Sequence, residues 1–172
     1  MDTKSFFSDK SLSAKQKTSE LSEIIADRPE ILPELIHYAS EGKDAERATI
    51  LEAFEYVSKK NPEIITAEVF DFVRHQLHSK SSRVKWESGK IIGNSISLYP
   101  EMVEEITPTL LENTRDESTV VRWSMAYALA EILKLRLSIN ETLVPKISET
   151  MKMEQKNSIL KIYQQALKQV KE

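Results

Sequence analysis

The segments VKWESGKIIGNS (residues 84–95) and VRWSMAYALAEI (residues 121–132) are near-copies that begin 37 positions apart, at Val84 and Val121. Each opens with a valine, a basic residue and a tryptophan, followed by a run of small and aliphatic residues. Apolar residues recur in both at the three- and four-residue spacing of one helix face. A helix that is written twice at such an interval predicts stacked helical units, because repeats of about 20 to 50 residues are typical of solenoids.

Further helices are predicted to begin at similar intervals along the chain. The sequence X-Pro-Glu occurs at Pro29, Pro62 and Pro100. Proline suits the first helical turn because its missing N–H has no partner there, and the glutamate complements the positive end of the helix dipole. Asn140 is expected to cap a fourth helix. A second helix follows each of these, so we expect a single domain over residues 1–172. Its predicted units are an N-terminal helix at 12–27 and helical pairs at 28–60, 61–98, 99–138 and 139–172.

The repeated helices carry small residues at matching positions, which predicts that they pack closely. These residues are Gly89 and Gly93 in one helix and Ala126 and Ala130 in the other. Small side chains in register allow two helix backbones to approach each other. The aliphatic residues of the same helices are predicted to form the core: Val84, Ile91, Ile92, Val121, Leu129 and Ile132.

Composition excludes several classes of protein. Three glycines are too few for the turns of an all-β domain, and no apolar run approaches the ~20 residues that cross a bilayer. The absence of cysteine excludes disulfides and thiolate metal sites. Asp71, His75 and His78 share a helix face but have no fourth ligand, so we expect neither a metal nor another cofactor. We expect a cytoplasmic protein with no membrane contact, and the net charge of −3 disfavours nucleic-acid binding.

The second quoted segment resembles the HEAT-repeat family, whose second helix typically reads Val-Arg, alternating small residues, Ala-Leu-Gly and an aliphatic residue. The residues that match this pattern are Val121, Arg122, Ala126, Ala128, Leu129 and Ile132. The first segment follows it less fully, at Val84, Lys85, Gly89, Ile92 and Gly93. The resemblance implies an all-α fold, a right-handed α-α superhelix (solenoid) of about four HEAT-like helical hairpins with an extra N-terminal helix. It also implies that the second helices line a concave groove.

Residues spaced four apart on these second helices would face that groove. The trios predicted to do so are Trp86, Lys90 and Asn94; Trp123, Tyr127 and Glu131; and Ala48, Glu52 and Tyr56. Because aromatic side chains dominate binding hot spots, we predict a groove that binds a partner. Its predicted residues are Trp86, Lys90, Trp123, Tyr127 and Glu131. The alternative is that the indoles only fill gaps between neighbouring hairpins.

Charge is segregated along the chain. Five basic residues and one acid lie between residues 74 and 90, and six acids and one base lie between 101 and 117. A basic spot beside aromatic residues could seat an acidic peptide or a nucleic-acid backbone, although charge runs are usually solvated surface. The resemblance implies that the basic residues Arg83, Lys85 and Arg122 are structural, because such residues commonly pair with acids of neighbouring turns. Asp116 is the expected partner of Arg122.

We therefore predict a monomeric, non-catalytic binding or scaffold module for a protein or peptide partner. The alternative is an enzyme like the alkylpurine DNA glycosylases, another group built of HEAT-like hairpins, which would use Glu131 or Glu87 as the acid. The acidic charge balance opposes DNA binding, and no Trp-Asp segment matches the expected catalytic helix. A third possibility is a purely structural subunit of a larger assembly.

Overall fold

The computed structural model describes residues 2–171, and no β-strand occurs in that range. Short 3₁₀ turns connect many of the α-helices; they are Pro29–Ile31, Pro62–Ile64, Gln76–His78, Ile96–Leu98 and Pro100–Met102. The α-helices of the described residues are α1 (Thr3–Ser8), α2 (Ala14–Asp27), α3 (Leu32–Glu41), α4 (Asp44–Lys60), α5 (Ala67–His75), α6 (Ser82–Ser95), α7 (Val103–Asn113), α8 (Thr119–Lys134), α9 (Asn140–Met153) and α10 (Asn157–Lys171).

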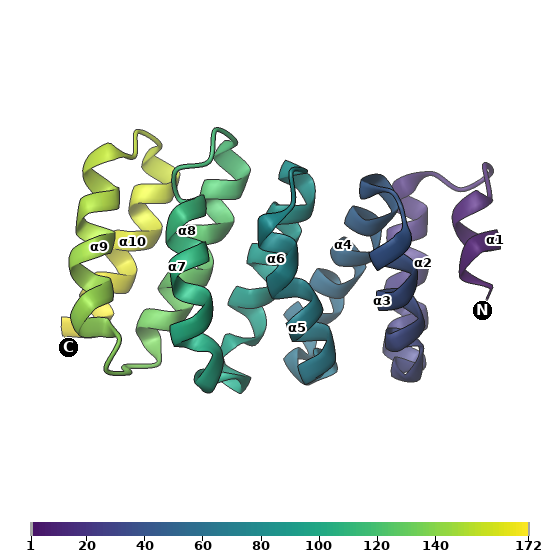
Figure 1. The fold of residues 1–172 in the computed structure, drawn as a ribbon, viewed down its shortest axis with the longest axis horizontal. Coiled ribbons are helices and arrows are strands. Elements are labelled where there is room, and N and C mark those ends of the chain that lie inside the picture. The colour runs from purple at the N-terminus through teal and green to yellow at the C-terminus, as the bar shows by residue number, and fades with distance from the viewer. Residues whose placement is uncertain (1, 172) are drawn as a thin grey trace.

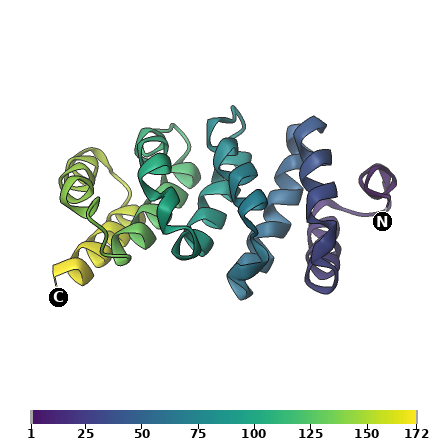
Figure 2. The same cartoon turned by 60° about the horizontal axis from the view of Figure 1, so that its bottom comes forward.

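From α3 onward the helices form four hairpins, namely α3/α4, α5/α6, α7/α8 and α9/α10. The second helix of each hairpin packs on the second helix of the next, so α2, α4, α6, α8 and α10 form one layer, here called the inner layer. Helices α3, α5, α7 and α9 form the outer layer (Figures 1 and 2). The predicted all-α solenoid of about four hairpins with an extra N-terminal helix is therefore confirmed. The two quoted segments are α6 and α8, which lie side by side.

The X-Pro-Glu sequences start the hairpins in a different way from the prediction. Pro29, Pro62 and Pro100 each begin a 3₁₀ turn rather than the α-helix itself. Helix α5 begins only at Ala67, because the side chain of Thr66 caps it by accepting a hydrogen bond from the Val69 N–H at 3.3 Å. Each X-Pro-Glu sequence therefore forms a tight 3₁₀ turn that precedes the α-helix.

The predicted cap at Asn140 is wrong. The N-cap residue of α9 is Ile139, and the cap makes no side-chain hydrogen bond. The Asn140 amide instead donates to the backbone carbonyl of Leu133 at 2.9 Å, so it ties the start of α9 to the end of α8. Asn140 is the first residue of α9 rather than its N-cap, and its side chain reaches the end of α8 instead of the first turn of α9.

The N-terminal end of the stack carries a short helix, α1, that the sequence interpretation did not predict. Asp2 caps α1 through the Ser5 N–H at 3.2 Å. Phe7 is buried and stacks on Tyr38 of α3, with ring centroids 5.2 Å apart. Lys17 of α2 donates to the Phe7 carbonyl at 2.7 Å. Helix α1 therefore covers the end of α3 and precedes α2 in the way that an outer helix precedes an inner one (Figure 1).

The predicted core residues of α6 and α8 are all buried: Val84, Ile91, Ile92, Val121, Leu129 and Ile132. The close approach of the two helices depends on Gly89. A Cβ atom placed there would lie 2.6 Å from both Ser124 Oγ and Met125 Cε, far inside van der Waals contact. The glycine thus sets the separation between the two hairpins that carry the candidate site.

Candidate functional site

Three consecutive inner helices, α4, α6 and α8, enclose a surface hollow of about 760 Å³. We call it the aromatic hollow; its lining residues are Glu52, Glu55, Tyr56, Lys59, Lys60, Trp86, Lys90, Val120 and Trp123. Trp86 and Trp123 are half-buried, whereas Tyr56 and Val120 are 49% and 43% exposed. Four large apolar side chains of the described residues are exposed, and two of them line this single hollow. Such a concentration of apolar surface is typical of a binding site.

A second, smaller hollow of about 350 Å³ adjoins the first. We call it the tyrosine hollow; it is lined by Ser58, Lys59, Pro62, Gly93, Asn94, Ile96, Ser97, Tyr127, Glu131, Lys134 and Leu135. The five predicted groove residues therefore divide between two neighbouring hollows. Trp86, Lys90 and Trp123 line the aromatic hollow, whereas Tyr127 and Glu131 line the tyrosine hollow. Lys59 lines both, so the two hollows adjoin at the last turn of α4.

Lys90 is not a free cation in the hollow, because neighbouring groups neutralise it. Its Nζ atom lies 2.8 Å from Glu87 Oε2, 3.8 Å from Glu55 Oε2 and 4.3 Å from the centroid of the Trp86 ring. Glu87 is only 1% exposed. Burial raises the pKa of Glu87, which the Lys90 ammonium opposes and the Glu52 and Glu55 carboxylates reinforce. Lys90 thus compensates buried carboxylates and holds the indole of Trp86 in place.

Tyr127 joins the three inner helices through a chain of hydrogen bonds. Its hydroxyl donates to Asn94 Oδ1 at 2.7 Å, and the Asn94 amide donates to Ser58 Oγ at 2.9 Å. Its ring stacks on Trp123, with centroids 5.9 Å apart and an interplanar angle of 18°. Burial, with smaller contributions from Glu131 and Glu55, raises the pKa of Tyr127 to about 12. Tyr127 therefore holds Trp123 at the border of the two hollows.

The trio predicted on α4 faces the hollow only in part. Ala48 is buried, so its predicted place in the groove is wrong. Glu52 accepts hydrogen bonds from Thr18 of α2 at 2.9 Å and from Arg83 of α6 at 2.8 Å. Only Tyr56 presents an open, unpaired surface to the hollow. Helix α2 packs on α4, and its Thr18 contacts Glu52, so this part of α4 is not open to the hollow alone.

The predicted basic positions form ion pairs between hairpins. Arg83 pairs with Glu52, Lys85 with Asp116 and Arg122 with Glu154. The expected pairing of Arg122 with the Asp116 carboxylate is wrong, because Lys85 occupies that carboxylate. Arg122 contacts Asp116 only at the backbone carbonyl, 2.9 Å from its Nη1.

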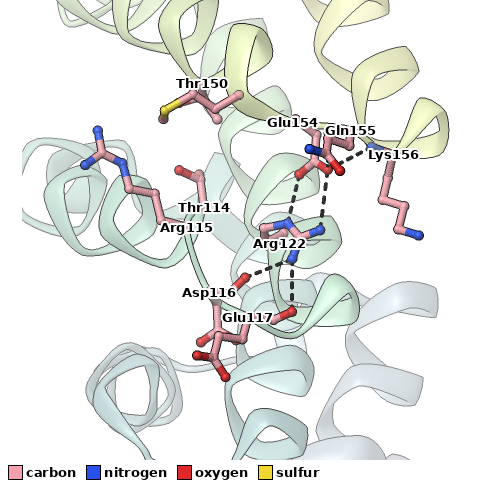
Figure 3. A pocket seen from close by; sticks show the side chains of 10 residues that line it. Thr114, Arg115, Asp116, Glu117, Arg122, Thr150, Glu154, Gln155 and Lys156 are labelled. Atoms are coloured by element: carbon pink, nitrogen blue, oxygen red, sulfur yellow. Dashed lines mark hydrogen bonds and ion pairs between the residues drawn. The ribbon is translucent and has the colours of Figure 1, made fainter.

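Figure 3 shows how Arg122 bridges the last two hairpins. Its Nε atom donates to Glu154 Oε2 at 2.9 Å, and its Nη1 atom also donates to the Glu117 carbonyl at 3.1 Å. Burial alone would raise the pKa of Glu154, but hydrogen bonds from Arg122 and from the Lys156 and Gln155 N–H groups outweigh it and lower the pKa. In the surrounding hollow of about 520 Å³, the charged groups of Arg122, Glu154 and Asp116 are therefore already paired, and they join neighbouring hairpins.

Two functional candidates were missed by the sequence interpretation. Lys59 and Lys60, in the last turn of α4, are exposed and line the aromatic hollow. Neither forms an ion pair with any residue in the described range 2–171. The four-residue spacing that predicted Tyr56 continues to Lys60, and this signal could have identified it.

Neither a cluster of metal-binding side chains nor a helix able to span a membrane occurs among residues 2–171. Among residues 2–171, no three side chains of His, Cys, Asp or Glu gather closely enough to hold a metal ion. In the predicted histidine cluster, His75 Nδ1 lies 2.7 Å from the Asp71 backbone carbonyl, and the Asp71 carboxylate is paired with Arg74. No helix in the described part of the chain combines the length and apolarity needed to cross a membrane.

Comparisons with known proteins show the fold class. No family model matches the chain, and no curated protein matches it. A designed armadillo repeat protein in complex with the peptide (KR)4 is 17% identical, with a TM-score of 0.68 over 96% of this chain and 78% of that one. An engineered protein is 17% identical, with a TM-score of 0.74 and coverages of 98% and 79%. Computationally designed armadillo repeat proteins for modular peptide recognition are 16% identical, with a TM-score of 0.68 and coverages of 90% and 74%. The chain thus has an α-solenoid repeat fold.

Proposed function

We propose that this protein is a non-catalytic module that binds a peptide segment of a partner protein in the aromatic hollow. The observation that supports this most directly is the pair of exposed apolar side chains, Tyr56 and Val120, on the two helices that flank α6. The half-buried indoles of Trp86 and Trp123 line the same hollow. Tyrosine and tryptophan offer large contact area at a low entropic cost, which is why they dominate hot spots.

The predicted groove residues take different parts in this proposal. Trp86 and Trp123 form the floor that a peptide side chain contacts. Lys90 and Tyr127 position the two indoles, through the ammonium–indole contact and the ring stack. Glu131 lies in the adjoining tyrosine hollow, where its carboxylate pairs with Lys134 at 2.5 Å. A longer peptide would reach Glu131 by continuing along α4.

The fold neighbours support a binding module rather than an enzyme. One of them is described in complex with a peptide and another as designed for modular peptide recognition. We infer that the repeats here are of the HEAT type, because each contains two α-helices, whereas armadillo repeats contain three. We also infer that the hairpins and α2 act as one domain, since each inner helix packs on the next.

The DNA glycosylase alternative is not favoured by either candidate acid. Glu87 is buried against Lys90, and Glu131 is paired with Lys134 outside the aromatic hollow. A role for Arg83, Lys85 and Arg122 in holding the hairpins together fits the ion pairs they make. A monomeric state and a cytoplasmic location stay predictions, and analytical ultracentrifugation would test the first.

Selection of a random dodecapeptide library on the immobilised protein tests the proposal. The decisive variant is the double substitution Tyr56→Ala, Val120→Ala, because both side chains are exposed and their truncation should leave the fold intact. We expect peptides selected on the natural sequence to bind this variant at least about tenfold more weakly, as fluorescence anisotropy would measure.

The matched control is Leu98→Ala, which removes an exposed apolar side chain that lies outside both hollows. Its peptide affinity should remain within about twofold of the natural protein, since it contacts no part of the site. Selected peptides that bind the double variant unchanged, or a library that yields no binders at all, would disprove the proposed function.

A further inference from the structure

The charges that line the aromatic hollow differ in how far they are already paired. Its carboxylates have internal partners, because Glu52 pairs with Arg83 and Glu55 lies near Lys90. The only other carboxylate of the network, Glu87, is buried beneath Lys90. Lys59 and Lys60 are exposed and make no ion pair within the range that the structure describes. The charge that the hollow offers to a ligand is therefore positive.

The distribution of charge between the two layers reinforces this sign. Helices α4, α6 and α8, which line the hollow, carry eight basic and six acidic side chains. Outer helices α3, α5 and α7 carry seven acidic and one basic side chain. Such a separation orients the field of the whole molecule, so that an anionic segment is attracted to the inner layer and repelled from the outer one. The same field would repel a cationic segment from the inner layer.

The size of the hollow sets the length of the segment that can occupy it. Neighbouring packed helices lie about 8–10 Å apart, so the path from α4 across α6 to α8 is about 16–20 Å. An extended chain rises about 3.3 Å per residue, so about five or six residues would span this path. One apolar side chain would lie over Trp86 between Tyr56 and Val120, and residues near α4 would face Lys59 and Lys60.

We infer that the aromatic hollow selects acidic peptides, specifically an extended segment in which Asp or Glu residues lie on one side of an aromatic or aliphatic side chain. The acidic residues contact the ammonium groups of Lys59 and Lys60, and the apolar residue contacts Tyr56, Trp86 and Val120. A lysine- or arginine-rich segment is disfavoured because it would have to displace Arg83 or Lys90 from its carboxylate partner. This inference rests on the proposed function and specifies the class of partner.

The same dodecapeptide selection tests the charge preference. We expect the enriched peptides to carry Asp or Glu on one side of an aromatic or aliphatic residue. The double variant Lys59→Glu, Lys60→Glu should bind these peptides about tenfold more weakly or worse, and raising the salt from about 0.05 M to about 0.5 M should weaken binding to the natural protein. Lys146→Glu, Lys152→Glu makes the same charge change on exposed positions of α9 and should leave the affinity within about twofold.

A milder variant separates binding from folding. Lys59 and Lys60 also complement the dipole at the end of α4, so their reversal can lower stability. Lys59→Gln, Lys60→Gln removes the charges without adding repulsion, and thermal unfolding monitored by circular dichroism reports its fold. We expect it to retain the fold and still lose most of the acidic preference.

The possible results of the selection distinguish the charge preference from peptide binding itself. Enriched peptides that are basic or neutral, and that depend on Tyr56 and Val120, would overturn the charge inference and leave peptide binding intact. A selection with no binders would overturn both proposals. Self-association that Lys59→Glu, Lys60→Glu abolishes would instead make a second copy of this chain the occupant, and would also overturn the inference.

Discussion

Helices α6 and α8 begin with the same valine, basic residue and tryptophan, yet they contribute different chemistry to the surface they share. At the position after the tryptophan, α6 has the buried Glu87 and α8 has Ser124. Four residues after the tryptophan, α6 has Lys90, which covers its own indole, and α8 has Tyr127, which stacks on its indole. The core pairs Val84/Val121, Ile91/Ala128 and Ile92/Leu129 are apolar in both helices, whereas the buried Ser88 and Ser95 of α6 correspond to Met125 and Ile132 of α8.

The comparison shows that the repeat keeps part of its core apolar and varies both some buried positions and the residues that it presents. Packing positions are constrained by the neighbouring hairpin on each side, because a solenoid core is continuous through every repeat. Positions on the open face are not constrained in this way, so α6 can carry charged groups where α8 carries aromatic ones. Variants at matched positions of the two helices can therefore separate structural residues from those free to serve binding.

The largest difference is expected at the basic position of the two helices. Arg122→Ala should lower the free energy of unfolding by about 2–3 kcal/mol, because it leaves Glu154, which is 3% exposed, without its cation and two carbonyls without a donor. Lys85→Ala should cost only about 1 kcal/mol, since its partner Asp116 is 13% exposed and keeps access to water. Urea unfolding monitored by circular dichroism measures both. Equal losses would show that burial does not distinguish the two pairs.

The next difference concerns the small residues that separate the helices. A Cβ atom at Gly93 would collide with the ring of Tyr127, so Gly93→Ala should destabilise the protein by about 1–2 kcal/mol even though alanine is the better helix former. Ala130→Gly, the matched change on α8, should cost about 1 kcal/mol through helix propensity and a lost methyl group. Only Gly93→Ala should also disturb the near-ultraviolet signal of Tyr127 and Trp123. A stabilised Gly93→Ala variant would show that the approach of the two helices is not tight.

The smallest effect on stability is expected at Glu87, the buried carboxylate of α6, where α8 has Ser124 at the matched position. Because burial raises the pKa of Glu87 above its ordinary value of 4.5, the folded state holds this proton more tightly than the unfolded state. The stability that Glu87 contributes should therefore fall as the pH rises from about its ordinary pKa through the raised value, and then stay constant. We expect the natural protein to lose stability relative to Glu87→Gln across that window, as urea unfolding at a series of pH values would measure. A difference that grows in the opposite direction would mean that the Lys90 ammonium dominates.

Local spacing predicted much of this structure, because the relevant physics acts within one helix or between equivalent helices. The four-residue period placed Trp86 and Trp123 at one hollow, and the apolar period identified the core of α6 and α8. Ala48 was misplaced because its exposure depends on the helices that pack around α4, which its own helix pattern does not reveal.

The pairing of charges could not be predicted from the sequence. Lys85 and Asp116 are 31 residues apart, and their contact depends on how two successive hairpin loops meet. Lys90 has the spacing of a groove residue, but the depth of Glu87 beneath it decides that its charge is neutralised. Once these residues are paired, the cations left for a partner at the aromatic hollow are Lys59 and Lys60. Both lie outside residues 74–90, the basic stretch that the sequence indicated.

We propose that the faces of α4, α6 and α8 together form one peptide-binding surface. Titration of the ¹⁵N-labelled protein with a library-selected acidic peptide, followed by nuclear magnetic resonance, tests it directly, because each indole N–H gives its own signal. We predict that the indole signals of Trp86 and Trp123 and the backbone amides around Tyr56 and Lys60 shift together and saturate at one Kd. Shifts confined to the outer helices α5 and α7, with both indole signals unmoved, would contradict the account.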